Sequence, residues 1–282
     1  MMLTPRLWHA LVNPDDYAPL YFQLRLTYRR PLRRFATYDL SLKNILLAIF
    51  NIFLAPFFSL VPPIAIFFLG TYWAGFVAGQ IQREHSHHRF DLLATLPGGP
   101  GDVYWTLAVL YMRESMIYQY VVDGLRITAL VGGMVVFVLG SGLSIGLFQP
   151  TLSGNEMLEL INATLTIAML FLFLYIQQMQ AAVLSQTVGM ALTTFTEQAA
   201  EARVGASLVF FTIQLVSYAG FAYIAFGIVP DWVGSTVPFT SSLSLLTGGT
   251  MVIAVQEVCI ALLWRRLHTV YGDIHLERLT AP

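Results

Sequence analysis

Long apolar segments, separated by short polar breaks, make up most of the chain. A helix that crosses a bilayer needs about 20 consecutive, mostly apolar residues. The pattern therefore predicts an all-α integral membrane protein with six transmembrane helices. The predicted spans are residues 44–60, 63–81, 127–148, 157–179, 207–229 and 243–264. No stretch between these spans has the length and composition of a soluble domain.

The first two predicted spans come from one uncharged segment, residues 44–82. This segment is too long for a single spanning helix, even a tilted one. Pro62 and Pro63 lie near its middle, and proline breaks a helix or opens a turn. We therefore divide the segment at the two prolines. A re-entrant hairpin, which enters the bilayer without crossing it, is the alternative for this segment.

Residues 101–126 are apolar but contain the adjacent charges Arg113 and Glu114. A charged residue at the centre of a membrane helix costs about 2.5–3.5 kcal/mol on insertion scales. We therefore expect this segment in the interface plane or in the cytoplasm, where it leads into the third span. A seventh span here would move every later arginine to the opposite side of the membrane.

Composition agrees with the membrane interpretation. The chain has 282 residues, 56% of them hydrophobic and 11% charged, with a mean hydropathy of +0.66. A soluble domain carries about 25% charged residues. The single cysteine, Cys259, excludes an internal disulfide. The first residues lack the apolar core of a cleavable signal peptide, so we expect the first span to direct insertion itself.

The positive charges predict the orientation. All 15 Lys and Arg residues lie before the first span, between the second and third, between the fourth and fifth, or after the sixth. Positively charged residues stay on the cytoplasmic side, and six spans place these four segments on that one side. We therefore expect a multi-pass protein of the cell membrane with both termini in the cytoplasm.

This topology predicts three regions along the chain. Residues 1–43 form a cytoplasmic or interfacial N-terminal segment, in which residues 17–44 mix aromatic residues with arginines. That mixture suits a helix at the headgroup level of the lipid bilayer, and it also suits a plain positive anchor. Residues 44–264 form the transmembrane domain, with residues 82–126 as its cytoplasmic segment. Residues 265–282 form a cytoplasmic tail.

The cytoplasmic stretch IQREHSHHRFDLLATLPGGP, residues 81–100, has an unusual pattern. Its glycines and prolines predict a turn at residues 95–100, and residues 83–94 can form a helix before that turn. Phe90, Leu92 and Leu93 would then project together. Such an apolar face either docks a partner protein or packs on the protein's own spans.

Part of this stretch, EHSHHRFDLLATLP, resembles the coupling segment of the permease subunits of ABC exporters of the second type. That family has the degenerate motif E-R-E-x-G-T-L-E-L-L-L-x-T-P between its second and third spans. Glu84 matches the first Glu, residues 90–93 match the L-E-L-L core, and Thr95 and Pro97 match the end with one residue inserted. The second Glu and the Gly-Thr pair are absent. Residues 186–211 also resemble the family's junction between its fourth and fifth spans.

The resemblance implies a permease subunit of an ATP-driven exporter, paired with a second permease copy or homologue. Two separate ATP-binding ABC subunits would bind the cytoplasmic segment. The family's coupling role then falls on Glu84, Arg89, Phe90, Asp91, Leu92, Leu93 and Pro97. The alternative is a non-transporting membrane subunit that serves as a scaffold for a larger complex.

Other activities lack support in the sequence. No phosphate-binding Walker motif occurs, so we expect ATP hydrolysis only in a partner subunit. We predict no catalytic site, cofactor or nucleic-acid partner. His85, His87 and His88 have a spacing that could serve zinc, but without a second ligand cluster nearby we interpret them as part of a solvated loop and predict no metal site.

Three further features lie in the predicted spans. Glu257 is an intramembrane acid, and such acids are costly and often functional; we expect it to reach the interface or to pair with Arg203 or Arg126. Gly75 and Gly79 form a small-residue face that permits close helix contact, either within the chain or with a second permease. Amides in or near the spans are expected to form interhelical hydrogen bonds rather than to bind a substrate: Asn51, Asn162, Gln177, Gln178, Gln180 and Gln214.

Overall fold

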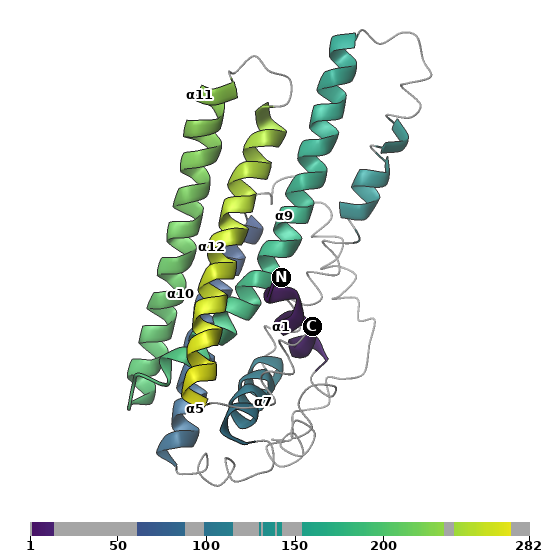
Figure 1. The fold of residues 1–282 in the computed structure, drawn as a ribbon. Coiled ribbons are helices and arrows are strands. Elements are labelled where there is room, and N and C mark those ends of the chain that lie inside the picture. Colours follow the sequence, from purple (N-terminus) through teal and green to yellow (C-terminus); the bar gives the residue numbers. More distant parts are fainter. Residues whose placement is uncertain are drawn as a thin grey trace. The chain divides into compact units, whose positions relative to one another are not determined.

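The computed structural model describes residues 2–13, 61–87, 99–114, 130, 132–138, 140–142, 154–233 and 240–271. Within these ranges the elements are helical and there is no strand (Figure 1). The elements are α1 (Thr4–Val12), α5 (Val61–Ser86), α7 (Gly99–Glu114), α9 (Gly154–Leu192), α10 (Ala199–Ala222), the π-helix η1 (Tyr223–Ile228), α11 (Val229–Val233) and α12 (Thr240–Tyr271).

Three helical segments of the described part are long and apolar enough to cross a membrane. They are Gly154–Leu192, Ala199–Trp232 and Thr240–Tyr271. Large apolar side chains stand exposed along them, such as Leu172, Leu215 and Phe226. A contiguous exposed apolar surface marks contact with a membrane or a partner. The described part of the chain therefore fits an all-α membrane protein.

Four of the six predicted spans lie in described helices, and three of these helical segments are the ones long and apolar enough to cross a membrane. Residues 63–81 lie in α5, 157–179 in α9, 207–229 in the continuous helical segment from α10 to α11, and 243–264 in α12. In the predicted span 127–148, the described residues are helical. The predicted span 44–60 lies outside the described residues.

Prolines determine two local features of these helices. Pro62 and Pro63 lie in the first turn of α5, where a missing N–H costs nothing.

Pro230 follows η1, in which the N–H of Val229 donates to the carbonyl of Ile224. A proline ring collides with the carbonyl four residues earlier in an α-helix. The wider π turns just before Pro230 make room for the ring.

The predicted turn at residues 95–100 needs a correction at its end. Gly99 and Pro100 belong to the first turn of α7. Proline is favoured there because its N–H would have no helical partner and its fixed backbone angle suits a helix. The predicted turn therefore extends two residues too far, and residues 95–98 lie outside the described part.

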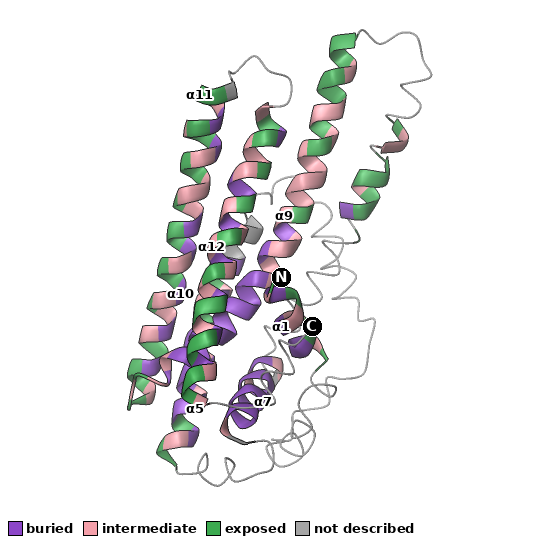
Figure 2. Cartoon of the chain, viewed as in Figure 1, coloured by how far each residue is buried: buried purple, intermediate pink, exposed green. Residues whose placement is uncertain are grey.

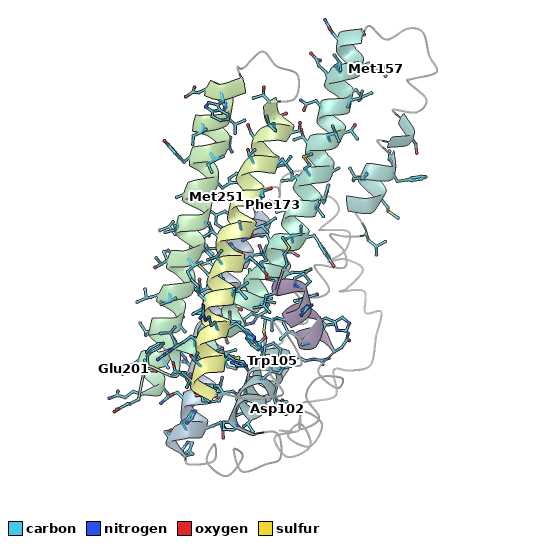
Figure 3. The ribbon with its side chains drawn as sticks, viewed as in Figure 1. Asp102, Trp105, Met157, Phe173, Glu201 and Met251 are labelled. Carbon is cyan, nitrogen blue, oxygen red and sulfur yellow. The ribbon has the colours of Figure 1, made fainter. Side chains whose placement is uncertain are left out.

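The chain divides into two compact units, and α9, α10 and α12 each contribute residues to both. The first unit comprises residues 1–120, 179–212 and 257–282. Its core includes α7, which Figure 2 shows as almost entirely buried. Trp105 of α7 packs edge-to-face on Trp264 of α12, with ring centroids 5.5 Å apart; Trp105 is labelled in Figure 3.

Glycines allow α5 to pack closely on α10 within this first unit. A Cβ atom at Gly75 would lie 2.3 Å from the Oγ of Ser207 and 2.8 Å from the carbonyl oxygen of Arg203. The hydroxyl of Ser207 donates to the carbonyl of Thr71 at 3.0 Å. A Cβ at Gly79 would contact the Arg203 side chain at 3.2 Å. The small-residue face thus serves packing within the chain.

The second unit comprises residues 121–178 and 213–256. Its helices are joined by amides, as the sequence predicted for Gln177 and Gln214. The Oε1 of Gln214 accepts from Nε2 of Gln177 at 3.2 Å and from Nε2 of Gln256 at 2.9 Å. Asn162 likewise accepts a hydrogen bond from Ser242 at 2.9 Å. These contacts confirm the interhelical role for Asn162, Gln177 and Gln214.

Candidate functional site

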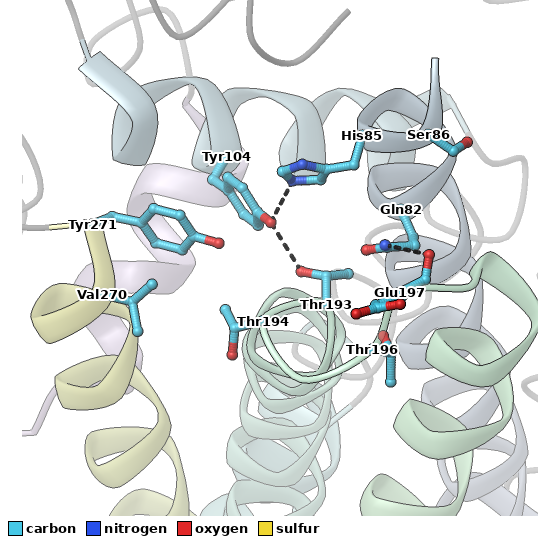
Figure 4. A pocket seen from close by; sticks show the side chains of 10 residues that line it. All are labelled: Gln82, His85, Ser86, Tyr104, Thr193, Thr194, Thr196, Glu197, Val270 and Tyr271. Atoms are coloured by element: carbon cyan, nitrogen blue, oxygen red, sulfur yellow. Dashed lines mark hydrogen bonds between the residues drawn. The ribbon is translucent and has the colours of Figure 1, made fainter. Parts of the chain in front are cut away.

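A polar pocket of about 420 Å³ lies within the first unit (Figure 4). Its walls come from the end of α5, the start of α7, the turn that follows α9, and the last turn of α12. Most of the lining side chains carry a hydroxyl, amide or imidazole group, and one carries a carboxylate. Neither Lys nor Arg is among the ten residues that line it.

Local helix geometry places the lining residues. Gln82, His85 and Ser86 are three and four residues apart on α5, so they share one helix face. Opposite them, a run of threonines follows the end of α9 at Leu192. The hydroxyls of Thr193 and Thr194 donate to the carbonyls of Met190 and Ala191, at 2.6 and 2.7 Å. Carbonyls at a helix end lack their usual partners; the Thr193 hydroxyl supplies one to Met190, and Ala191 also accepts the backbone N–H of Thr194 at 3.1 Å.

Tyr104 of α7 is the central side chain of the pocket. Its Oη lies 2.6 Å from Nε2 of His85 and 3.3 Å from Oγ1 of Thr193. Its ring centroid is 4.4 Å from that of Tyr271. Burial raises the pKa of the Tyr104 phenol above its ordinary value, so the group stays a neutral hydroxyl at physiological pH. It therefore ties α5 to the end of α9.

Gln82 has one amide atom that the protein does not satisfy. Its Nε2 donates to the backbone carbonyl of Glu197 at 2.9 Å. Its Oε1 is buried, has no hydrogen-bond partner and is directed toward the pocket interior (Figure 4). A buried acceptor without a donor costs about 1–3 kcal/mol. A donor brought in by a bound molecule would recover that cost.

Of the predicted coupling residues, only Glu84 lies in the described part. It is buried, and its Oε1 accepts a hydrogen bond from the hydroxyl of Tyr111 on α7 at 2.7 Å. Sequence reasoning did not foresee this contact within the chain. The other predicted coupling residues lie outside the described part: Arg89, Phe90, Asp91, Leu92, Leu93 and Pro97. Contact of the segment with an ATPase stays a prediction.

The intramembrane acid Glu257 has a partner that the sequence did not reveal. Its carboxylate accepts hydrogen bonds from the backbone N–H groups of Leu3 and Thr4 and from the Thr4 hydroxyl. The sequence predicts the interface, Arg203 or Arg126 as the surroundings of this acid. The N-terminus of a helix carries unsatisfied N–H groups and a positive partial charge, so α1 can replace an arginine as the partner of this acid.

The pocket itself was missed, although two signals pointed near it. One was the histidine cluster, and the other was the threonine run after α9. In the described part of the chain no group of three or more His, Cys, Asp or Glu residues could hold a metal ion; His88 lies outside that part. No family model, curated protein or solved structure matches the chain. A function must therefore be argued from these residues.

Proposed function

We propose that this chain is the membrane-spanning permease subunit of an ATP-driven ABC exporter of the second type. In this proposal the chain crosses the cell membrane six times, with both termini in the cytoplasm. It pairs with a second permease copy or homologue and binds separate ATPase subunits through residues 84–97. The resemblance of that segment to the family's coupling helix is the basis of the proposal.

The observation that best supports it is the continuity of α5. This helix runs from Val61 to Ser86 without a break, a length of 26 residues. At 1.5 Å per residue it extends about 39 Å, which exceeds the hydrocarbon thickness of about 30 Å. The predicted span 63–81 and the first residues of the predicted coupling segment are therefore parts of one rigid element.

The packing of α5 suggests how a load on its end would spread. Gly70 and Gly75 lie so close to Phe210 and Ser207 of α10 that even a Cβ atom would not fit. Gly189 of α9 is also closely packed, because a Cβ atom there would lie 2.9 Å from the backbone oxygen of Ala74. Close packing transmits displacement because interiors compress little. Closure of the ATPase subunits would thus tilt α5 together with α9 and α10.

The test is co-purification of the ATPase with a double variant, Phe90→Asp with Leu93→Asp. The proposal requires that the ATPase is lost while the chain still inserts into the membrane. Trp232→Asp is the matched control, because Trp232 is an exposed aromatic residue in a connection predicted to face the other side. An ATPase retained by the double variant and the control alike would refute the coupling role.

A further inference from the structure

We propose that the pocket formed by α5, α7, α12 and the turn after α9 binds a small organic ammonium ion, that is, a protonated amine carrying N–H donors. The inference goes beyond the proposed function and does not depend on it, since binding requires only this chain. It follows from the acceptors, the charge and the aromatic surface of the pocket.

The first argument is the unsatisfied acceptor. Gln82 is 7% exposed, and its Oε1 has no partner while its Nε2 is held by the carbonyl of Glu197. That bond fixes the amide orientation, so Oε1 is presented to the pocket as an acceptor. A ligand that matches it must bring a donor, and an N–H of an ammonium group forms the stronger, charge-assisted kind of hydrogen bond.

The second argument is charge. Glu197 is an exposed carboxylate on the pocket wall, and no Lys or Arg lines the pocket. A phosphate or carboxylate ligand would find no positive partner among these residues unless His85 were protonated. A cation gains from Glu197, and the neutral hydroxyls of Thr194 and Thr196 can accept its remaining N–H donors.

The third argument is aromatic surface. Tyr271 is half-buried and lines the pocket, and its ring is tilted by 33° to that of the buried Tyr104 behind it. Cations are attracted to the faces of aromatic rings, by about 0.5–1 kcal/mol at exposed sites. An ammonium ion with a short alkyl part would contact both the aromatic ring and the polar wall. A metal ion or a purely apolar molecule would not contact both.

The test uses four small probes on the purified full chain in detergent, followed by ligand-observed saturation-transfer NMR. They are n-propylammonium, n-propanol, propionate and tetramethylammonium. The first three each contain three carbon atoms and differ in charge and in hydrogen-bond donors. Tetramethylammonium carries a positive charge but has no N–H donor. We expect n-propylammonium to bind most tightly, tetramethylammonium and n-propanol more weakly, and propionate not at all.

Two variants separate the hydrogen bond from the charge. Gln82→Met should weaken n-propylammonium about tenfold, as expected for a buried bond to a charged group, and leave tetramethylammonium nearly unchanged. Glu197→Gln should weaken both cations about threefold, as expected for an exposed ion pair, without affecting n-propanol. Glu201→Gln is the matched control, because Glu201 is an exposed acid of α10 outside the pocket.

The outcomes decide the proposal. Equal binding of all four probes, or no binding of n-propylammonium, overturns it. Glu197→Gln tests the proposal even if Gln82→Met fails to fold, because the Glu197 side chain is exposed and its replacement should not disturb folding. An unchanged affinity of Glu197→Gln for the two cations also overturns the proposal. Co-purification of the ATPase with the Phe90→Asp, Leu93→Asp double variant tests only the coupling segment. Its outcome does not change the expected binding of n-propylammonium to the pocket.

Discussion

Glu257, within α12, accepts a hydrogen bond from the backbone N–H of Thr4 at 3.1 Å and so caps the first turn of α1. The two residues are 253 positions apart in the sequence. Thr4, Leu7, Ala10 and Leu11 form the buried side of α1. The acid thereby anchors the start of α1, while the apolar side chains hold the rest of it. The carboxylate of Glu257, in the apolar helix α12, is thus stabilised by N–H and O–H donors at the start of α1 rather than by a cationic side chain.

Replacing Glu257 by Leu should therefore release α1. Hydrogen bonds to charged groups contribute about 1.5–3 kcal/mol, so amide protection in α1 should fall at least tenfold. Hydrogen–deuterium exchange over residues 4–12 measures this directly. Glu201→Gln removes an exposed acid and should leave exchange in α1 unchanged. Equal protection of α1 in the Leu variant and the parent would show that its apolar side chains suffice.

This pairing also marks the limit of sequence reasoning. Hydrophobic length predicted the helices that contain residues 157–179 and 243–264 because a membrane constrains each span independently. The partner of Glu257 depends on how two distant helices meet, which no local pattern encodes. The pocket is hidden for the same reason, since Gln82, Tyr104 and Tyr271 become neighbours only through packing. The sequence predicts the interface or an arginine as the surroundings of Glu257, because side-chain charges are visible in a sequence, whereas the contact with a distant helix N-terminus is not.

The shared acceptor Gln214 leads to a second prediction. Gln214→Leu leaves the Nε2 groups of Gln177 and Gln256 without their acceptor, and interhelical bonds of this kind contribute about 0.6–1.7 kcal/mol. We expect a lower melting temperature in detergent. Replacing all three glutamines by Leu should recover much of the loss, because that also removes buried amide atoms without partners.

Thr212→Val is the control for this series, since Thr212 is exposed on the same helix as Gln214 and should tolerate the change. A triple Leu variant that melts well below the single variant would contradict the argument. It would mean that the amides stabilise the helices through more than the two bonds to Gln214.

The close contact between α5 and α10 gives a third prediction. Gly75→Ala places a methyl group 2.3 Å from the Ser207 Oγ and 2.8 Å from a backbone oxygen, so the helices must separate. Overpacking of this kind costs about 1–3 kcal/mol. At Gly133 a Cβ meets nothing within 4 Å, and Ala should raise stability by about 0.4–1 kcal/mol through the unfolded chain. The melting temperature should fall for Gly75→Ala and rise for Gly133→Ala. Equal shifts in the two variants would refute the close contact between α5 and α10.

Tyr104 provides a fourth prediction. Tyr104→Phe keeps the ring and removes the hydroxyl that contacts His85 and Thr193. Loss of these bonds in a buried site should cost about 1–2 kcal/mol, measured as a lower melting temperature. Tyr72→Phe is the matched control, because Tyr72 is about half exposed on α5. If both variants melt alike, the Tyr104 hydroxyl does not hold the pocket together.

The pH dependence of stability provides the last prediction. Burial raises the pKa of the Tyr104 phenol, while in the unfolded chain the phenol ionises near its ordinary value of about 10. The stabilisation is therefore fully present below pH 10 and is lost as the pH rises toward the folded-state pKa, because the unfolded state releases its proton first. Melting temperatures from pH 8 to 11 should fall less steeply for Tyr104→Phe than for the parent. Parallel slopes for the parent and Tyr104→Phe would mean that the phenol titrates alike in both states, and that water reaches it in the folded protein.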